Sequence, residues 1–440
     1  MAQAPDSTRP LNGLLIGTAS AATQIEGGDR NNQWWEWAQT PGNMADGSSP
    51  ERANDHWNRW REDNELMAEL GFPIARVGLE WSRIEPSPGK FDHAALDRYR
   101  EELGDLVDKG IKPLVTLHHF SNPLWLQHRG QWTNPGSVDA FLRYARVAVG
   151  ALKDLVDEWV TLNEPNVYAT QAHLFREAPP ADVSPGSLVR VLRHMAIAHV
   201  RAYTLIHAVQ PDATVTIAHH LRDFAPMNPR NPLHRAFTRL NQWAFNDVVT
   251  DAFGLGRFTS LLGRSPLPEG RYADVIGLNY YSRTAVTGPS DGVFPGVPVN
   301  DLGWEIWPQG LVTCARSLHE RLGVPVWITE NGCADNGSAT ELERFRPRFL
   351  AEHLGAILDS GLPIERYYHW CFVDNWEWAE GEVQRFGIVH NDYETQTRTV
   401  KPSGRMLAEV VAEGALTPSI IEQYSAGQEY PRADGSSRPA

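Results

Sequence analysis

The stretch Trp159-Val160-Thr161-Leu162-Asn163-Glu164-Pro165-Asn166 places an acidic side chain at the end of a short apolar run. The range Trp159–Leu162 has the composition of a buried strand, and Pro165 ends it because proline restricts the residue before it. A second stretch repeats this arrangement, since Glu330-Asn331-Gly332 follows the apolar run Val324–Thr329. Charged residues mostly lie at protein surfaces, so one glutamate at a strand end would mean little. Two glutamates in matching contexts predict one site with paired carboxylates.

Strand-like and helix-like segments alternate along the rest of the chain. The segments with the composition of buried strands are Leu14–Ala19, Ile74–Leu79, Pro113–Leu117, Trp159–Leu162, Thr214–Ala218, Val275–Leu278, Val326–Thr329 and Ile364–Trp370. Amphipathic, helix-like stretches lie at Asp55–Leu70, Ala94–Lys109, Val138–Leu155, Leu188–Val209, Ala236–Phe253, Pro308–Leu322 and Arg344–Asp359. Alternating strands and helices predict an α/β fold with a parallel sheet, and eight such strands predict a single (β/α)₈ TIM barrel.

The expected domain organisation is one catalytic barrel over residues 11–425, because no interdomain linker or further internal repeat is visible. Residues 1–10 and 426–440 are rich in Pro, Gly and Ser, so we expect both ends to be disordered. Pro/Gly-rich loops are expected at 178–187, 222–234 and 284–303. The last of these is long enough to be a lid over a site, and a passive surface insertion is an equally good interpretation.

Polar and aromatic residues lie within or just after most predicted strands. Because the chemistry of such barrels takes place at the C-terminal ends of the strands, these residues are expected to converge there. They are Gln24, Arg76, His118, His119, Asn163, Glu164, Asn279, Tyr280, Tyr281, Glu330, Trp370, Glu377 and Trp378. The fifth strand leads to His219 and His220 and offers fewer candidate site residues than the others. Amides and carboxylates bind hydroxyl groups and Trp faces stack on C–H surfaces, so the set favours a neutral polyol as ligand.

Composition excludes several other functions for these 440 residues. The formal net charge of −14 and the absence of a basic cluster argue against a nucleic-acid partner. No apolar run approaches the roughly 18 residues of a membrane span, and Met1–Pro10 lacks the apolar region of a signal peptide. The three cysteines, Cys314, Cys333 and Cys371, form no disulfide framework and suit a reducing, cytoplasmic location. No Cys or His spacing indicates a metal site.

Three motifs carry a resemblance to a known family. Thr161-Leu162-Asn163-Glu164-Pro165, Ile328-Thr329-Glu330-Asn331-Gly332 and Asp374-Asn375-Trp376-Glu377-Trp378-Ala379 resemble the signatures of glycoside hydrolase family 1, the retaining β-glucosidases. Gly17–Gly27, Trp304–Pro308 and Arg385–Ile388 also resemble family sequences, in the family's order, so the match runs from about residue 12 to residue 411. Any one motif alone would be a weak signal, whereas the full set is specific.

The resemblance implies a single (β/α)₈ barrel without a cofactor, with Glu164 as general acid/base and Glu330 as nucleophile. Arg76 and Tyr281 match the partners of the nucleophile, and Asn279 matches a residue that lines the pocket. The positions that match those holding the sugar hydroxyls are Gln24, His119, Asn163, Glu377 and Trp378. Trp370 matches the platform at the mouth of the site, and Phe386 matches the wall near the sugar's C6.

Hydrolysis with retention explains why two carboxyl groups are needed, at a separation of roughly 5–5.5 Å. One must be ionised to attack the anomeric carbon, and the other must be protonated to donate to the leaving oxygen. Arg76 is expected to keep Glu330 ionised, and a hydrogen bond from Tyr281 to aim it. Glu164, in apolar surroundings near a second carboxylate, is expected to keep its proton. The pKa of Glu164 should fall once Glu330 is esterified, which suits a switch to general base.

Some positions stay open or depart from the family pattern. His118 is ambiguous between core and ligand, Trp376 is expected in the core, and the three cysteines are expected to be buried apolar residues. Phe120 replaces a Trp that the family often has after the third-strand His, which affects one stacking contact and not the chemistry. Glu377 would repel a phosphate, so an unphosphorylated sugar is expected.

We therefore expect a retaining β-glycosidase that removes terminal β-D-glucosyl residues from a small-molecule β-glycoside or short oligosaccharide. Galactosyl and fucosyl residues should be tolerated. One alternative is a transglycosylase that uses the same covalent intermediate, and another is a non-catalytic sugar-binding barrel. The ratio of transfer product to hydrolysis product at high acceptor concentration distinguishes a transglycosylase from a hydrolase. The intact Glu164/Glu330 pair argues against a non-catalytic barrel. The natural aglycone depends on the variable rim loops, and the sequence gives no indication of oligomeric state.

Overall fold

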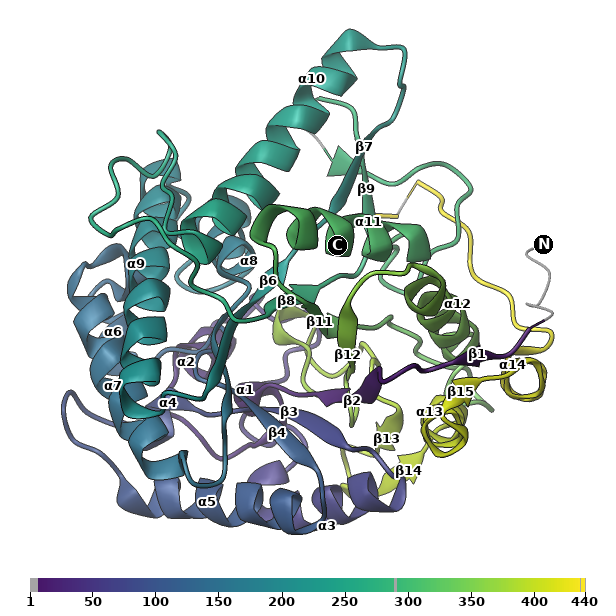
Figure 1. Ribbon diagram of the computed structural model, residues 1–440. Helices are drawn as coiled ribbons and strands as arrows, with labels where there is room; N and C mark the ends of the chain where they lie inside the picture. The colour runs from purple at the N-terminus through teal and green to yellow at the C-terminus, as the bar shows by residue number, and fades with distance from the viewer. Residues whose placement is uncertain (1–6, 289–290, 436, 440) are drawn as a thin grey trace.

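Eight parallel strands close into a barrel in a computed structural model that describes residues 7–288, 291–435 and 437–439 (Figure 1). Their order is β11-β12-β2-β3-β4-β5-β6-β8, and β8 closes the ring by pairing with β11. The barrel strands are β2 (Leu15–Ala19), β3 (Ile74–Gly78), β4 (Lys112–Thr116), β5 (Glu158–Asn163), β6 (Thr214–His220), β8 (Ile276–Asn279), β11 (Val326–Asn331) and β12 (Ile364–Trp370). The predicted (β/α)₈ barrel is confirmed, and each predicted strand coincides with one of these.

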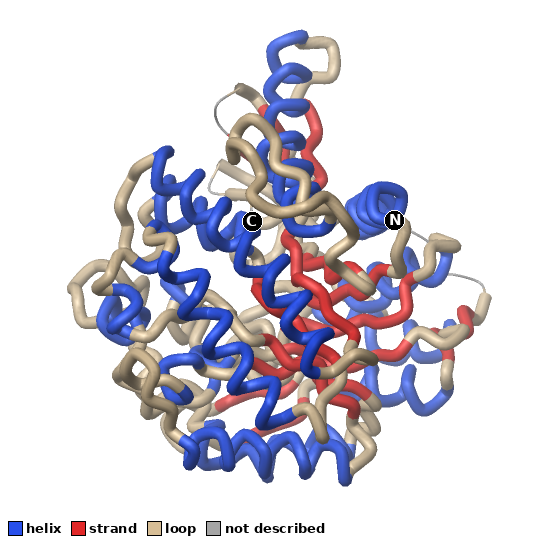
Figure 2. The backbone as a smooth tube through the Cα atoms, turned by 60° about the vertical axis from the view of Figure 1, so that its left-hand side comes forward, coloured by secondary structure: helices blue, strands red, loops and turns tan. Residues whose placement is uncertain are grey.

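Helices follow every barrel strand and form the outer layer seen in Figure 2. The longer ones are α3 (His56–Glu69), α5 (His93–Asp108), α7 (Gly136–Leu152), α9 (Pro185–Val209), α10 (Pro232–Asn241), α11 (Pro308–Leu322), α12 (Arg346–Asp359), α13 (Pro402–Glu413) and α14 (Pro418–Ser425). Short helices lie in the loops: α1 (Ala22–Ile25), α2 (Gln33–Ala38), α4 (Trp81–Ile84), α6 (Leu124–Gln127) and α8 (Pro165–Thr170). The predicted helical stretches all coincide with helices, and α10 continues beyond its end as π-helical turns at Gln242–Asp247 and Thr250–Gly254.

Side chains alternate between the inside and the outside of the barrel because successive residues of a strand face opposite ways. Ile74, Leu114 and Val160 belong to a buried inner cluster with Tyr368 and Trp370. Arg76 lies two residues after Ile74 in β3, so it also faces inward, nearer the C-terminal ends of the strands. Gly17 of β2 permits close contact there, because a Cβ atom at this position would lie 2.0 Å from the Ile74 carbonyl oxygen.

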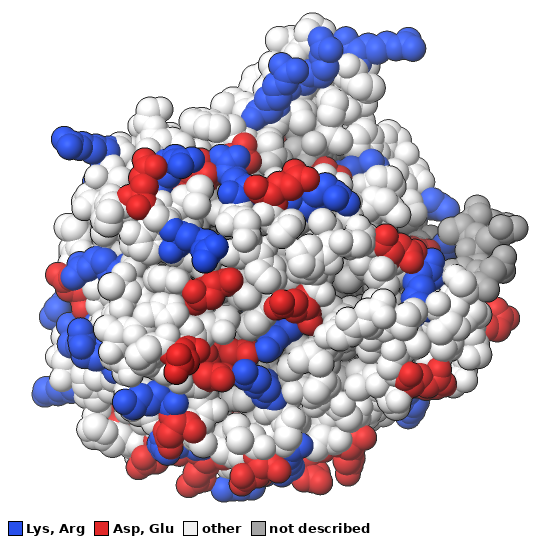
Figure 3. All heavy atoms as spheres, viewed as in Figure 1, with Lys and Arg blue, Asp and Glu red and all other residues white. Residues whose placement is uncertain are grey.

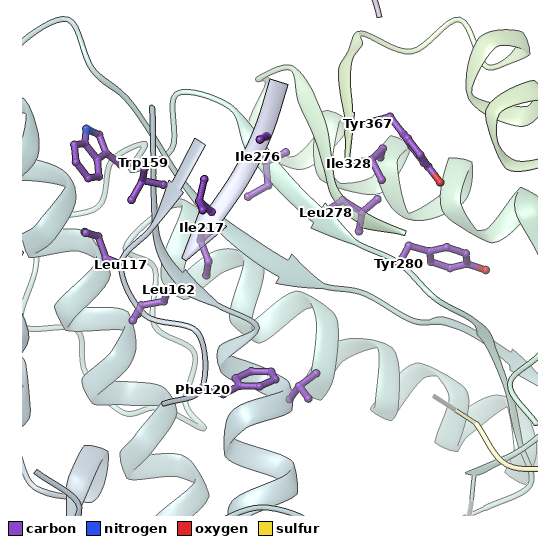
Figure 4. Close-up of a cluster of buried hydrophobic side chains, with 14 of the residues drawn as sticks. Leu117, Phe120, Trp159, Leu162, Ile217, Ile276, Leu278, Tyr280, Ile328 and Tyr367 are labelled. Atoms are coloured by element: carbon purple, nitrogen blue, oxygen red, sulfur yellow. The ribbon is translucent and has the colours of Figure 1, made fainter. Parts of the chain in front are cut away.

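The larger apolar core lies between the strands and the helices. Figure 4 shows part of it, in which Trp159, Ile217, Leu278, Ile328 and Tyr367 from neighbouring strands lie among buried apolar side chains. These residues alternate with the inward-facing ones, so both faces of each strand are covered by apolar groups or by the site. This is why the strands read as continuous apolar runs in the sequence.

An arm projects from the barrel above β6 and β8 (Figures 1 and 2). It consists of α10 and a small sheet of β7 (Asp223–Pro226), β9 (Arg283–Val286) and β10 (Asp291–Gly292). The ranges 222–234 and 284–303 were predicted as loops, and the structure corrects this by placing β7 and β9 in them. The strands are too short to show a period-2 pattern. Figure 3 shows Lys and Arg gathered at the tip of this arm, while both signs of charge mix over the rest of that face.

Parts of both chain ends lie against the barrel. Residues 1–6 of the expected disordered N-terminus are outside the described residues, while β1 (Arg9–Pro10) pairs with β15 (Ala415–Leu416). In the C-terminal segment Tyr430 is buried and donates to Glu352 Oε2 at 3.0 Å. A further hairpin joins β13 (Val389–Asn391) to β14 (Arg398–Val400). Over the described ranges, no helix is both long enough and apolar enough to cross a membrane.

A buried histidine beside two carboxylates gives a stability prediction. His56 Nδ1 lies 2.7 Å from Asp63 Oδ2, and Nε2 lies 3.0 Å from Glu102 Oε1. Burial lowers the pKa of His56, but Glu102 and Asp63 outweigh it and raise the pKa to about 9. Because this pKa is raised on folding, the stabilisation is complete below about pH 6.5 and is lost as the pH rises through 9; it amounts to about 3 kcal/mol at most.

The expected result is a loss of up to that free energy of unfolding between pH 6.5 and pH 9 in the unaltered protein. The loss should be smaller by that amount in His56→Gln, because no group titrates at position 56 in this variant. Urea unfolding at the two pH values measures it, with His128→Gln, an exposed histidine beside Glu36, as the matched control. Parallel pH profiles for the unaltered protein and His56→Gln would contradict the prediction.

Candidate active site

Glu164 and Glu330 lie at the C-terminal ends of β5 and β11 and both are buried. Glu164 follows the last residue of β5 and has left-handed backbone angles, φ 41° and ψ 60°, before Pro165 begins α8. Glu330 is within β11, where the register with β8 shifts between Ile328 and Glu330. Both positions therefore depart from a regular strand. The sequence predicted that the two carboxyl groups lie at strand ends, but not these local departures from strand geometry.

Glu330 is held by two charged or polar partners. Arg76 Nη1 donates to Glu330 Oε1 at 2.5 Å, and the Tyr281 hydroxyl donates to Glu330 Oε2 at 2.6 Å. Arg76 is itself fixed, because its Nη2 donates to Asn163 Oδ1 at 2.7 Å and its Nε donates to Thr116 Oγ1 at 3.0 Å. The structure thus brings Arg76 and Tyr281 to the carboxyl group they were predicted to contact. The contact of Thr116 with Arg76 was not predicted, since a Thr inside a strand gives no indication of function.

Glu164 is held through a single oxygen. Asn279 Nδ2 lies 2.8 Å from Glu164 Oε1 and donates to it, and His220 Nδ1 lies 3.1 Å from the same atom. Asn279 also donates to Asn163 Oδ1 at 3.1 Å, so it links the two strand ends. His220 is a site residue that the sequence did not predict. Its position at the end of the fifth strand was the available signal.

The two carboxyl groups influence each other's ionisation. Burial raises the pKa of Glu330 to about 7; Arg76 opposes this and the charge of Glu164 adds to it. Burial also raises the pKa of Glu164, but the charge and hydrogen bond of His220 outweigh it, so the net shift is downward. The contact with His220 thus distinguishes the two carboxyl groups, because it lowers the pKa of Glu164 while burial raises that of Glu330. The expectation that Glu164 keeps its proton did not include this contact.

The predicted sugar-binding residues lie in two connected groups. In the first, Asn163 Nδ2 donates to His119 Nε2 at 2.9 Å, and His119 Nε2 lies 4.0 Å from Glu330 Oε1. Burial and the charge of Arg76 keep the pKa of His119 well below its usual value, so this imidazole is neutral. Its Nδ1 is buried and has no hydrogen-bond partner in the described part of the chain.

In the second group, Gln24 Nε2 donates to Glu377 Oε2 at 3.0 Å and to Asn375 Oδ1 at 3.2 Å. Burial raises the pKa of Glu377 to about 8, because the hydrogen bond from Gln24 offsets only part of it. Near neutral pH this carboxyl group is therefore largely uncharged. The expected repulsion of a phosphate is correspondingly weaker, although no cation is among the groups that act on the pKa of Glu377.

Aromatic rings line the opening. Trp370 and Trp378 lie 5.7 and 5.9 Å from the His119 ring, centroid to centroid. Trp370 is the last residue of β12 and is only 2% exposed. Its role as a platform at the mouth of the site stays a prediction. The segment after β11 packs closely against the end of β12 because Gly332 has no Cβ atom. A Cβ atom there would lie 2.0 Å from the Trp370 carbonyl oxygen. Phe120 fills space beside Trp378 at 5.3 Å.

The opposite wall is formed by Phe386, Trp304 and Tyr281. Phe386 lies 6.0 Å from Trp304 and 6.4 Å from Tyr281, again between ring centroids. Phe386 thus lies beside Tyr281, which donates to Glu330. Trp304 was noted only as part of a motif, and the structure adds it to the wall.

The ambiguous residues fall into the core. His118 Nε2 lies 3.0 Å from Asn122 Oδ1, and its ring packs against Trp132, so His118 is structural. Trp376 is fully buried, as expected, in a cluster with Trp34. All three cysteines are free and buried. Within the residues described, no three His, Cys, Asp or Glu side chains are grouped so that they could hold a metal ion.

The sequence of the whole barrel matches a known family. Residues 9–266 and 270–415 match the profile of Glycosyl hydrolase family 1. The chain belongs to glycosyl hydrolase family 1. The resemblance drawn from the motifs is thereby confirmed, and the site described above lies in a glycosyl hydrolase.

Curated members of family 1 match nearly the full length. "Beta-glucosidase A" of Thermotoga maritima is 33% identical over 436 residues, covering 92% of this chain and 98% of that protein. "Beta-glucosidase" of Agrobacterium sp. is 32% identical over 429 residues, covering 89% and 93%. "Beta-galactosidase" of Saccharolobus solfataricus is 29% identical over 479 residues, covering 93% and 96%. The names of these similar proteins thus refer to two different sugars, glucose and galactose.

Solved structures of family 1 share the fold. The Thermotoga maritima β-glucosidase in complex with glucoimidazole has a TM-score of 0.86 and 33% sequence identity, covering 93% of this chain and all of that chain. The same enzyme in complex with deoxynojirimycin gives the same TM-score, identity and coverage. Both ligands are small molecules, so the similar structures bind compounds of that size.

Proposed function

We propose that the protein is a retaining β-glycosidase of the β-glucosidase type. It removes terminal non-reducing β-D-glucosyl residues, and tolerates galactosyl and fucosyl residues, in small β-glycosides or short oligosaccharides. The observation that carries this proposal is the pair of buried carboxyl groups with different partners. Glu330 has a permanent cation and a phenol, while Glu164 has an amide and an imidazole. One environment suits a nucleophile and the other a proton carrier.

The proposed reaction has two steps. In the first, a Glu330 oxygen attacks the anomeric carbon, the bond from that carbon to the leaving oxygen breaks, and Glu164 donates its proton to that oxygen. In the second, Glu164 takes a proton from water, the water oxygen attacks the anomeric carbon, and Glu330 leaves as a carboxylate. Charge at Glu330 is thus lost and regained, and Arg76 and Tyr281 hold this carboxyl group through both steps.

The reaction requires the shared proton on Glu164. Arg76 and Tyr281 both donate hydrogen bonds to Glu330, and each of these bonds favours the ionised form of that carboxyl group. The transition state also places positive charge at the anomeric carbon beside Glu330, which favours the ionised form there. We therefore assign the proton to Glu164 in the reacting complex.

The glycone is held by the two hydrogen-bonding groups already described. His119 and Asn163 form one, and Gln24 and Glu377 form the other, with Trp370, Trp378 and Phe386 as apolar surfaces. A neutral sugar ring needs this combination of donors, acceptors and rings. The names of the similar proteins, β-glucosidase and β-galactosidase, agree with tolerance at one hydroxyl. We also propose a cytoplasmic location, which the three free cysteines support.

Rates on a panel of 4-nitrophenyl glycosides test this function. The panel contains the β-glucoside, β-galactoside, β-fucoside, β-mannoside, β-xyloside and 6-phospho-β-glucoside. We expect the highest kcat/KM on the β-glucoside, activity on the β-galactoside and β-fucoside, and none on the phosphorylated sugar. The pKa of Glu377 predicts that any residual activity on the phosphorylated sugar falls further from pH 6 to pH 9, as this carboxyl group ionises.

Glu330→Gln, purified in the same way, serves as the blank for contaminating glycosidases. A folded protein that is silent on the whole panel would favour a sugar-binding barrel or an unusual glycone. High transfer to an added alcohol, with little free sugar released, would favour the transglycosylase. Preference for the 6-phosphorylated substrate would contradict the proposed glycone site.

A further inference from the structure

His220, the last residue of β6, contacts the proposed acid/base directly. Its Nδ1 atom lies 3.1 Å from Glu164 Oε1, and Asn279 Nδ2 donates to the same oxygen at 2.8 Å. Among the described residues, Glu164 Oε2 accepts no hydrogen bond. One oxygen of the carboxyl group is therefore fixed twice, while the other is available to a substrate.

The imidazole itself is held firmly. It stacks on Tyr281 with an angle of 19° between the rings, and its edge meets Phe245 at 90°. Its backbone carbonyl accepts from Asn166 Nδ2 at 2.7 Å. The side chain is nearly fully buried, and Nε2 has no hydrogen-bond partner among the described residues. Buried polar atoms without partners are uncommon, so an imidazole kept in this state calls for a reason other than stability.

Other charged groups around Glu164 have different positions and partners. Arg76 of β3 donates to Glu330, and Tyr281 also donates to Glu330. Arg222, two residues after His220, lies 3.7 Å from Asp291 and over the ring of Phe245. The adjacent His219 bonds to Asn246 O and Thr250 Oγ1. Among the residues described, His220 is thus the titratable side chain in hydrogen-bond contact with Glu164.

We propose that His220 is the positioning residue of the acid/base. Its Nδ1–H holds Oε1, so that Oε2 carries the proton to the leaving oxygen, and its charge sets the upper pH limit of activity. This inference rests on the proposed role of Glu164. When the Oε2–H bond breaks and the proton passes to the leaving oxygen, the carboxylate that remains is already hydrogen-bonded at Oε1. The lowered pKa of Glu164 agrees with a cation at this distance.

Two variants separate the two effects. His220→Phe keeps a ring against Tyr281 and Phe245 but removes both the donor and the charge. His220→Asn removes the charge and can still donate to Oε1. Without the cation the pKa of Glu164 rises, so Glu164 keeps its proton to higher pH, and the basic limb of kcat/KM should move up by about 1 pH unit in both variants.

The leaving-group dependence reports on positioning. In His220→Phe, kcat/KM for methyl β-glucoside should fall about tenfold more than kcat/KM for 2,4-dinitrophenyl β-glucoside, because only the poor leaving group needs a well-aimed proton. The KM for the dinitrophenyl glucoside should change little. His220→Asn should restore the ratio toward that of the unaltered protein. His219→Asn, a change at the adjacent imidazole, is the matched control and should leave both the ratio and the pH limb unchanged.

An unchanged basic limb and an unchanged ratio in His220→Phe would overturn this inference, even if Glu164→Gln shows the expected leaving-group dependence. Failure of Glu164→Gln to show that dependence would instead contradict the proposed function. Circular dichroism checks that the variants are folded. If His220→Phe does not fold, the pH profile of kcat/KM for His220→Asn is the test. A basic limb that does not shift in His220→Asn also overturns the inference.

Discussion

Glu330→Gln should reduce kcat/KM by at least about 10⁴-fold for every glycoside, whatever its leaving group, because no carboxylate remains to form the covalent intermediate. The amide can still accept from Tyr281, but its NH₂ end faces Arg76, the residue that donates at 2.5 Å to the native carboxylate. Steady-state rates on the 4-nitrophenyl and methyl β-glucosides measure the loss. The loss should be alike for the two substrates, since both leaving groups are displaced by the same attack of Glu330.

A mechanism-based label gives the same conclusion independently. A 2-deoxy-2-fluoro β-glucoside should inactivate the unaltered protein, and peptide mass mapping should place the sugar on Glu330. Glu365→Gln is the matched control: Glu365 lies in β12, accepts from Trp327 Nε1 at 2.9 Å and is exposed, so this variant should keep its rate and its label. A label on any other carboxyl group would contradict the assignment of Glu330 as the nucleophile.

Glu164→Gln should separate substrates by leaving group. For methyl β-glucoside or cellobiose, kcat/KM should fall by about 10²–10⁴-fold, because protonation of the leaving oxygen is lost. For 2,4-dinitrophenyl β-glucoside the first step needs little acid catalysis, so kcat/KM should change far less. The slow step for this substrate then becomes hydrolysis of the covalent intermediate, which lacks its general base, and kcat should fall.

Azide tests the second step directly. In Glu164→Ala a small anion can enter the space left by the side chain and attack the intermediate without a base. Azide should therefore raise kcat for the dinitrophenyl glucoside and yield the β-glucosyl azide, which chromatography detects. The unaltered protein is the control and should show neither effect. Equal losses on both substrates, with no azide product, would remove Glu164 from its proposed role.

The barrel was predictable because its strands are covered on both faces. Continuous apolar runs such as Trp159–Leu162 and Val326–Thr329 report that burial directly, and the helices between them show their own period. The arm was not predictable, because β7 and β9 are four residues each and gain their pairing from one another across more than fifty residues of chain. Short elements of this kind depend on tertiary contacts and not on local pattern.

The site was predictable to the extent that a residue lies close to a strand end. Arg76, Asn163, Asn279 and Glu330 follow from the strands, and the motifs assigned their expected partners. His220 also ends a strand, but an imidazole in that place has several uses, and its neighbour Glu164 lies in a different segment of the chain. Its effect on the ionisation of the carboxyl pair follows only from a distance between two side chains. The burial of Trp370 likewise depends on how β12 ends relative to β11.

The left-handed backbone at Glu164 bears on how the sequence of this protein can drift. A residue with a Cβ atom pays about 1 kcal/mol or more to hold such angles, whereas glycine holds them freely. A change from Glu to Gly at position 164 would therefore relieve the backbone while removing the proposed acid. Without selection for turnover, such a change would leave a barrel with less backbone strain and without this acid. We therefore expect a glutamate at this position to be retained only where turnover of a substrate is under selection.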